Sequence, residues 1–225
     1  NLARLRKAYA LQQLGTVADL EQAESLLEHC LQAEQASSDH DEALYLLAWI
    51  LVDLDREEEG QAAFQEIADE HPDSKYWSDS AYRLARSYFK NGEKDSAQNL
   101  VSKLIKIDEI QDELLSKVMS LYAELTLSEG NWTSFTDSIR LVQSRLEKAK
   151  DKPVAREKAQ YWLAESLYRQ KKYNESLKEF GALDASVQLI QVSLEPWVLL
   201  RRAQCLGFLN RWVEAGVLAE QSKET

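Results

Sequence analysis

The stretch HPDSKYWSDSAYRLARSYFKNGEKDSA, residues 71–97, decides the fold because it contains a helix stop followed by a helical hairpin. Pro72 lacks an amide hydrogen and disfavours helical geometry at the residue before it, so we expect a helix to end here. Ser74 has a hydroxyl group that can cap the next helix. Gly92 tolerates left-handed backbone geometry just past a helix end, and it therefore predicts a turn between two helices.

The composition favours an all-α protein. The chain has 225 residues, of which 44% are hydrophobic and 29% charged, and this length suffices for one large domain or one extended array. It contains only 7 Gly and 3 Pro, too few for the many tight turns of an all-β sandwich or barrel.

The hairpin pattern recurs along the chain. Further turns are expected at Leu14-Gly15, Glu129-Gly130, Lys171-Lys172 and Leu209-Asn210. When the helix before each turn is aligned on Ala85, an alanine stands at the equivalent position of six successive segments, with spacings between 37 and 41 residues. These anchor alanines are Ala8, Ala48, Ala85, Ala123, Ala164 and Ala203.

Other positions repeat in the same register. Tyr45, Tyr82 and Tyr161 stand three residues before the anchor alanine. Small residues stand twelve positions after it, and bulky apolar residues sixteen after it. Small residues let two helices approach closely while bulky ones fill the space beside the crossing, so we predict a helix-turn-helix repeat. The small set is Gly60, Ala97, Ser176 and Ala215, and the bulky set is Phe64, Val101, Ile139 and Phe180.

The pattern resembles the tetratricopeptide repeat (TPR) family, which combines a Leu-Gly or Leu-Ala pair, a later Tyr, a Gly turn and a small residue. Leu84, Ala85, Tyr88, Gly92 and Ala97 match it, and two other units match it in part. Departures from the pattern are the longer units, Phe135 at a position for a small residue, and Ala23, which needs about three extra residues to align.

The resemblance implies a right-handed superhelix (solenoid) of about five to six helical hairpins, with the first helix of each hairpin on a concave face. It implies one domain over residues 1–225, with approximate units 1–38, 39–74, 75–110, 111–151, 152–190 and 191–225. The junction from Asp184 to Glu195 is the least helical in pattern and predicts a longer loop.

The concave face is the candidate partner-binding site. Aromatic and Arg side chains dominate protein interfaces because they combine large apolar area with a directed polar end. The arginines would favour a peptide that bears carboxylates. In the alternative interpretation, the tyrosines pack against the next hairpin and the arginines pair with acidic residues such as Asp79 and Glu165. The candidates are Tyr45, Trp49, Tyr82, Arg83, Arg86, Phe89, Tyr161, Trp162, Tyr168, Arg169 and Arg201.

The junction around Pro72 resembles that of bacterial envelope TPR proteins, of the outer-membrane assembly lipoprotein and Tol-Pal-associated cell-division coordinator type. This resemblance implies a periplasmic or envelope-associated protein, with a cytoplasmic location as the alternative. No stretch reads as a membrane span, so no direct membrane insertion is expected. The net charge of −11 repels phosphate backbones, so nucleic acid is not an expected partner.

No residue pattern points to an enzyme. Cys30 and Cys205 are expected to be core thiols, and the three histidines have neither catalytic nor metal-ligand spacing. The run DREEE, residues 55–59, lacks the alternating oxygen ligands of a calcium loop. We therefore expect no catalytic, metal or cofactor site.

The sequence thus predicts a non-enzymatic interaction scaffold that binds a peptide or partner segment in the concave groove, and the envelope resemblance implies a role in bacterial cell-envelope assembly. Two alternatives stay open. The chain could be an architectural spacer or oligomerisation segment without a groove ligand, or a docking arm of a larger enzyme or regulator. The sequence does not specify an oligomeric state.

Overall fold

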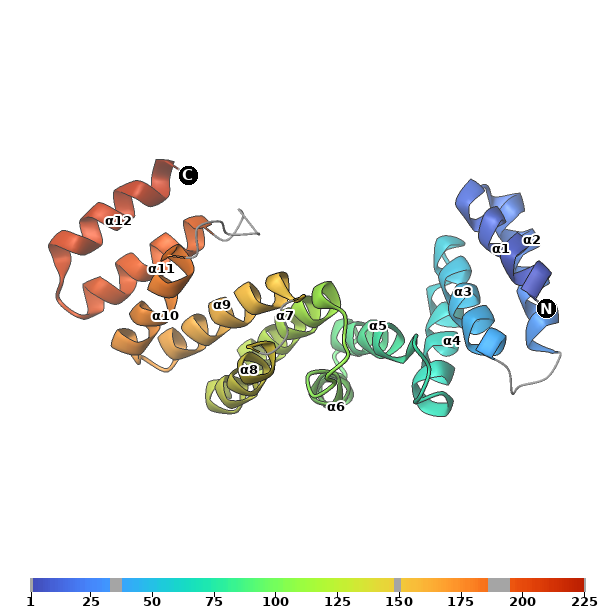
Figure 1. The fold of residues 1–225 in the computed structure, drawn as a ribbon, viewed down its shortest axis with the longest axis horizontal. Coiled ribbons are helices and arrows are strands. Elements are labelled where there is room, and N and C mark those ends of the chain that lie inside the picture. Colours follow the sequence, from blue (N-terminus) through green and yellow to red (C-terminus); the bar gives the residue numbers. More distant parts are fainter. Residues whose placement is uncertain (1, 33–37, 148–150, 186–194, 225) are drawn as a thin grey trace. The chain divides into compact units, whose positions relative to one another are not determined.

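A computed structural model describes residues 2–32, 38–147, 151–185 and 195–224, and the described residues form helices and turns without a strand (Figure 1). The helices are α1 (Leu2–Leu14), α2 (Val17–Leu31), α3 (Ser38–Asp53), α4 (Glu57–Glu70), α5 (Trp77–Lys90), α6 (Lys94–Leu104), α7 (Asp112–Glu129), α8 (Trp132–Leu146), α9 (Pro153–Arg169), α10 (Tyr173–Ala185), α11 (Glu195–Phe208) and α12 (Trp212–Glu224).

The chain divides into two compact units, Asn1–Leu100 and Val101–Thr225. In the first unit α1 packs on α2 and α3 on α4, and the hairpins join through α2 with α3 and α4 with α5. In the second unit α9 contacts α7, α8 and α10, and α11 packs on α10 and α12. The expected all-α helical-repeat fold is confirmed.

Six turns inside hairpins share one design. Each has a single residue with left-handed backbone geometry, and that residue lies seven positions after an anchor alanine. Only glycine adopts this geometry without steric cost, yet three of the six are not glycine. The six residues are Gly15, Asp55, Gly92, Gly130, Lys171 and Asn210. The five turns named from the sequence are confirmed, and the turn at Asp55 is an addition.

Four of these turns are Schellman motifs, in which two amide groups past the helix end donate back to its last carbonyls. At Gly92, the Gly92 amide donates to the Phe89 carbonyl at 3.1 Å and the Glu93 amide to the Tyr88 carbonyl at 2.8 Å. Asp55, Lys171 and Asn210 have the same pair of bonds. Gly15 and Gly130 instead make the single hydrogen bond of the simpler left-handed cap. The Gly130 amide, for example, donates to the Thr126 carbonyl at 2.7 Å.

The close helix crossing predicted for the hairpins is present in α3–α4 and in α9–α10. A Cβ atom added to Gly60 would lie 2.8 Å from the carbonyl oxygen of Ala48. In another hairpin, the Ser176 hydroxyl donates to the carbonyl of Ala164 at 2.9 Å. Both contacts join the small position to the anchor alanine, so the helices meet at this point of the repeat.

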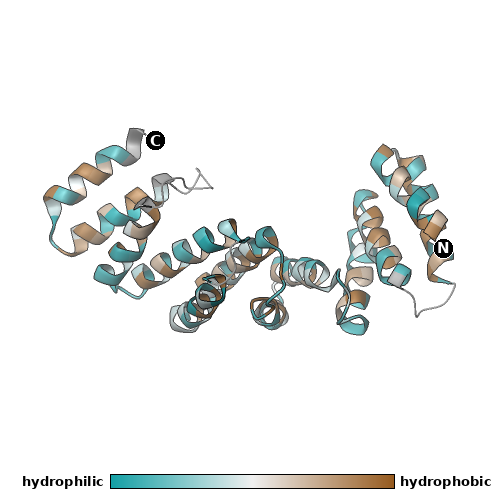
Figure 2. Ribbon diagram, viewed as in Figure 1, coloured by the Kyte–Doolittle hydropathy of each residue, from teal (hydrophilic) through white to brown (hydrophobic). Residues whose placement is uncertain are grey.

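The core consists of the apolar faces that the repeat pattern predicts. The anchor alanines are all buried, and so are Phe64, Val101, Ile139 and Phe180. Burying each large apolar side chain contributes roughly 1.5 to 3 kcal/mol relative to exposure. Figure 2 shows the corresponding alternation of apolar and polar residues around the helices. Phe135, which departs from the small-residue pattern, is fully buried and makes edge contacts with Tyr122 and Trp132.

Two helix starts differ from the simplest expectation. Ser74 does not cap α5: its hydroxyl accepts the amide of Tyr76 at 3.3 Å, and the helix begins only at Trp77. Ser74 therefore closes a serine turn before the helix, because its hydroxyl reaches the amide two residues on. The start of α9 is capped from another helix, since the Asp112 carboxylate of α7 accepts the amides of Val154 and Ala155.

The predicted loop from Asp184 to Glu195 lies almost wholly outside the described residues. Among the described helices, none combines the length and the apolar character that a membrane span requires.

Candidate functional site

Two candidate residues of the first unit, Tyr45 and Trp49, belong to an aromatic cluster between α3, α4 and α5. Tyr45 of α3 stacks on Tyr76 with ring centroids 4.4 Å apart. Trp49, one turn later on α3, meets Phe64 of α4 edge to face at 5.9 Å. The first contact joins the α3–α4 hairpin to the segment before α5 and the second lies within that hairpin, so Tyr45 and Trp49 contribute to packing within the unit.

Arg83 of α5 is engaged by this cluster. Its Nε donates to the Asp79 carboxylate at 2.7 Å, and its guanidinium lies 3.5 Å from the centre of the Trp49 ring. The same Asp79 oxygen accepts the hydroxyl of Tyr45 at 2.7 Å. Burial, together with the hydrogen bond to this carboxylate, raises the pKa of Tyr45 to about 12. Arg83 is therefore both paired and stacked within its own chain.

The other candidates on α5 differ in exposure. Tyr82 is only 8% exposed and belongs to the core, Phe89 is half-buried, and Arg86 is exposed. Among the described residues, no hydrogen bond or ion pair involves Arg86. Of the two arginines predicted on this helix, Arg86 is the one free to contact a partner.

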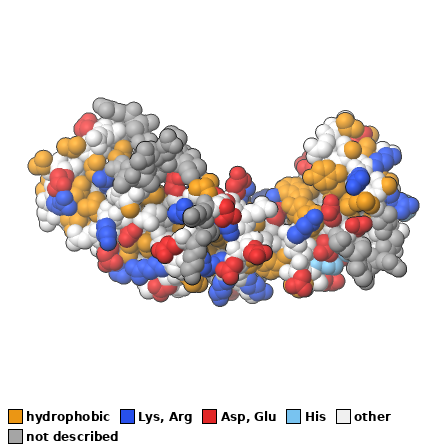
Figure 3. Space-filling view, viewed as in Figure 1, with side chains coloured by type: hydrophobic (Ala, Val, Ile, Leu, Met, Phe, Trp, Pro, Cys, Tyr) orange, Lys and Arg blue, Asp and Glu red, His pale blue; other side chains and the backbone are white. Residues whose placement is uncertain are grey.

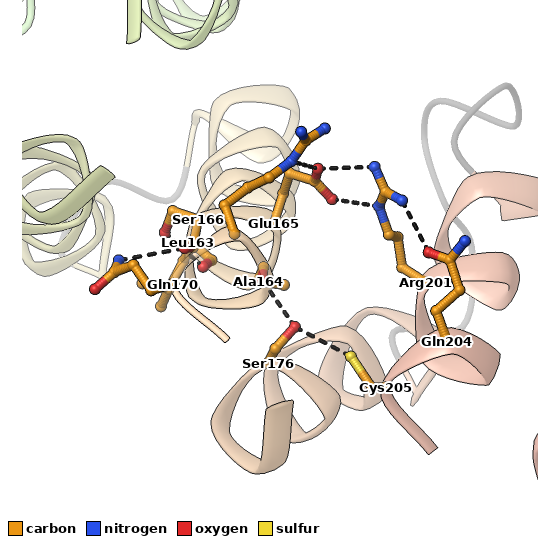
Figure 4. A network of polar contacts seen from close by, with 10 residues as sticks. Leu163, Ala164, Glu165, Ser166, Gln170, Ser176, Arg201, Gln204 and Cys205 are labelled. Carbon is orange, nitrogen blue, oxygen red and sulfur yellow. Dashed lines mark hydrogen bonds and ion pairs between the residues drawn. The ribbon is translucent and has the colours of Figure 1, made fainter. Parts of the chain in front are cut away.

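In the second unit, Glu165 of α9 is the centre of a polar network (Figure 4). It is 2% exposed. Arg169, one turn later, donates to it at 2.7 Å, and Arg201 of α11 donates through two nitrogens at 2.7 and 2.9 Å. Arg201 also donates to Gln204 at 2.8 Å. The pairing alternative considered from the sequence is thus the observed arrangement of Arg83, Arg169 and Arg201.

Tyrosines surround this network. Arg201 lies over the ring of Tyr168 at 4.6 Å, and Tyr161 contacts Trp162 and Phe180 edge to face. Burial raises the pKa of Tyr161 to about 12, and the nearby Glu165 carboxylate adds to the shift. Tyr161 therefore stays neutral over the whole physiological range and acts as an apolar packing residue.

Beside the network lies an apolar groove of about 540 Å³, which we call the α11–α12 groove. Its residues come from α9, α11 and α12. Two of them, Phe208 and Trp212, are 57% and 67% exposed and stand on either side of the turn at Asn210. The groove is lined by Tyr168, Leu200, Ala203, Gln204, Gly207, Phe208, Trp212, Ala215, Gly216 and Ala219.

Of the candidates predicted from the sequence, only Tyr168 lines this groove, and Arg201 contacts both Tyr168 and Gln204 in its wall. Sequence reasoning missed the α12 side. The signal was present in the small residues Ala215, Gly216 and Ala219, which lie on one face of a short helix that follows Trp212. Small residues on an exposed helix face leave room for another helix.

The residues considered for chemistry have structural partners. In the DREEE run, Arg56 pairs with Glu59 at 2.6 Å and with Glu24 of α2 at 2.7 Å. Cys30 and Cys205 are buried and form no disulfide, as expected, and the Cys205 thiol donates to the Ser176 hydroxyl at 3.5 Å. Burial raises the pKa of Cys205, which disfavours the reactive thiolate.

The comparisons with known proteins agree with the geometry. Sequence profiles described as tetratricopeptide repeat match residues 17–79 and 79–108. No curated protein sequence matches the chain.

Solved structures share the fold at low sequence identity. A TPR protein from Parabacteroides merdae aligns with a TM-score of 0.61 and 19% identity, over 97% of this chain and 77% of the other. PilF of Pseudomonas aeruginosa aligns with a TM-score of 0.60 and 13% sequence identity, over 99% of this chain and 93% of PilF. BtubC (BKLC) from P. vanneervenii aligns with a TM-score of 0.64 and 14% sequence identity, over 96% of this chain and 90% of BtubC. The chain therefore carries tetratricopeptide repeats, matched over residues 17–108, and its hairpins have the fold of TPR proteins.

Proposed function

We propose that this chain is a non-enzymatic scaffold that binds an amphipathic helical segment of a partner protein, with the α11–α12 groove as the main contact. TPR repeats are a protein-interaction module, and the observation that carries the proposal is the exposed, mostly apolar groove with Phe208 and Trp212 at its edge. A volume of about 540 Å³ is in the range of binding pockets.

The shape of the groove supports a helix as the ligand. Ala215, Gly216 and Ala219 leave the wall on α12 without bulk, and a Cβ atom added at Gly216 would meet no atom within 4 Å. A partner helix could therefore approach closely, with apolar side chains against Phe208 and Trp212. Exposed aromatic residues of this kind commonly dominate binding energy.

Charge supports a basic partner. The chain has a net charge of −11, and Arg83, Arg169 and Arg201 are already paired with carboxylates of the chain. Capture of an acidic peptide by these three arginines would require breaking those pairs. A helix with lysines or arginines beside its apolar face complements the negative electrostatic potential of the chain better than an acidic peptide does. Nucleic acid, which is also negative, complements it poorly.

The test uses two labelled amphipathic peptides with the same leucine face and either lysines or glutamates opposite. By fluorescence anisotropy, the lysine peptide should bind the intact protein, and Gly216→Leu should weaken binding at least about tenfold by filling the groove. Gly181→Leu is the matched control, because a Cβ atom there also meets nothing within 4 Å and the residue does not line the groove. Equal weakening by both variants, or no binding of either peptide, would overturn the proposal.

A second candidate function is architectural, with α12 as a stacking surface for a second copy of the chain. Val213 and Val217 of α12 are 85% and 57% exposed, which favours an apolar contact on this helix. Sedimentation velocity of the protein alone decides between the two. A dimer that Val213→Lys disrupts would support the architectural role, and a monomer at micromolar concentration would exclude it.

For the compartment, we propose the bacterial periplasm or another part of the cell envelope. The support is the resemblance of the junction at Pro72 to envelope TPR proteins. Fusion of alkaline phosphatase to the complete gene product tests it, because that enzyme is active only outside the cytoplasm. An inactive but abundant fusion would favour the cytoplasm.

A further inference from the structure

Two of the three histidines meet at one end of the α3–α4 hairpin. His40 lies in the first turn of α3, and His71 is the residue at which α4 ends. Their ring centroids are 5.5 Å apart, and Glu66 of α4 completes a group whose nitrogen and oxygen ligand atoms all lie within 4.8 Å of one another. In the space-filling view, histidine reaches the surface of the first unit beside acidic side chains (Figure 3).

His71 is oriented by a carboxylate. Its Nδ1 lies 2.9 Å from the Asp41 carboxylate, so Nδ1–H donates to Asp41 and Nε2 keeps its lone pair. Metal-binding histidines are usually held in this way, with the second ring nitrogen donating to a carboxylate or carbonyl. This contact leaves the other ring nitrogen of His71, Nε2, available to a metal ion.

His40 has an unused ring nitrogen. The residue is only 6% exposed, and among the described residues its Nδ1 has no hydrogen-bond partner. Leaving a buried polar group unsatisfied costs about 1 to 3 kcal/mol, so such groups need an explanation. A bound cation would supply one, since a neutral imidazole binds a metal through a free nitrogen lone pair.

We propose that His40, Glu66 and His71 form a binding site for a divalent transition metal, with Zn²⁺ the best match. Two imidazoles and one carboxylate suit zinc, whereas calcium and magnesium prefer oxygen ligands. Three protein ligands leave the fourth tetrahedral position to water.

The geometry requires only a small closure. Zinc-to-ligand bonds of about 2.0 to 2.2 Å in a tetrahedron put the ligand atoms roughly 3.4 Å apart. Because all the ligand atoms lie within 4.8 Å of one another, no pair has to close by more than about 1.4 Å, which side-chain rotations can supply. The ion would connect the first turn of α3 to the end of α4, directly before the junction at Pro72.

The test measures Zn²⁺ affinity of the whole protein with a competing chromophoric chelator. His71→Gln and Glu66→Gln change ligands near the surface and should each weaken binding by at least about tenfold. Asp41→Asn should weaken it by about tenfold through loss of the carboxylate that orients His71. His29→Gln is the matched control, because His29 is the remaining histidine and is exposed on α2. Circular dichroism verifies that each variant is folded.

Cobalt substitution separates this site from the cysteines. Co²⁺ should give visible absorption bands of nitrogen and oxygen ligands without the near-ultraviolet charge-transfer band of a thiolate. One equivalent of Zn²⁺ should also raise the melting temperature of the parent but not of His71→Gln. Zinc affinity that is the same in His71→Gln, Glu66→Gln and the parent, or a thiolate band with Co²⁺, would overturn the site.

Discussion

Arg201 of α11 clamps the buried carboxylate of Glu165 on α9 through two nitrogens, across 36 residues of sequence. Glu165 stands one position after its anchor alanine, and Arg201 two positions before the next. The same two repeat positions meet in the first unit, where Trp49 follows Ala48 and lies under Arg83. A repeat contact is thus retained while its chemistry changes from a cation on an aromatic ring to an ion pair.

Glu165→Gln should destabilise the second unit by about 3 kcal/mol, because it leaves Arg201 partly buried without its counter-ion. Asp79→Asn in the first unit should cost only about 1 kcal/mol, since the Asp79–Arg83 pair is about one-third exposed on both sides. Urea unfolding followed by circular dichroism measures both. Equal losses for the two variants would mean that burial does not set the strength of these pairs.

Gly60→Ala should be destabilising by about 1 to 3 kcal/mol, although alanine favours helix, because the new methyl group would lie 2.8 Å from a carbonyl oxygen of α3. Gly181→Ala, in a helix with open space at this position, should instead stabilise by about 0.5 to 1 kcal/mol. Thermal unfolding of both variants measures the difference. A gain for Gly60→Ala would mean that α3 and α4 do not cross closely.

The left-handed turn residues predict a pair of opposite effects. Lys171 has a φ of 61° and an exposed side chain, so Lys171→Gly should remove backbone strain and stabilise by about 0.5 to 1 kcal/mol. Gly92→Ala, at a φ of 83°, should destabilise by about 1 kcal/mol. Melting temperatures that move in the same direction would contradict this account of the turns.

Ionisation of Tyr161 predicts a loss of stability at alkaline pH. The folded pKa of about 12 exceeds the unfolded value of 10.0, so the stabilisation is complete below pH 10 and is lost as the pH rises toward 12. The loss should amount to about 2 to 3 kcal/mol. Tyr161→Phe should reduce the decline between pH 10 and 12, whereas Tyr9→Phe, at an exposed side chain, should leave it unchanged. Urea unfolding at several pH values makes the comparison.

Local signals made the hairpins predictable from sequence. Gly15, Gly92 and Gly130 mark turns because glycine favours left-handed geometry, and the recurring alanines set the register. The turn at Asp55 was not predicted, because an aspartate side chain does not require left-handed geometry and the acidic run that follows it indicates only a helix start. Asn210 was predicted because asparagine tolerates left-handed geometry, whereas the lysine side chain of Lys171 does not by itself require a turn.

The candidate site was less predictable, because its contacts join residues that are a repeat or more apart. The choice between an exposed and a paired Arg201 depends on where Glu165 lies in the preceding hairpin, which composition does not reveal. The histidine group was missed for the same reason: His40 and His71 lie on different helices and have no metal-ligand spacing in sequence. Partner binding by the predicted aromatic residues remains a prediction.

The fixed interval between each anchor alanine and its turn has a consequence for insertions and deletions. Six repeats differ in total length, yet the seven-residue interval is the same in all of them, so every difference in length falls after the turn or before the alanine. Removing a single residue between Ala85 and Gly92 would rotate the turn by about 100 degrees around the helix axis and misdirect the start of α6. An added residue in the connection after α6 would have no such rotational effect.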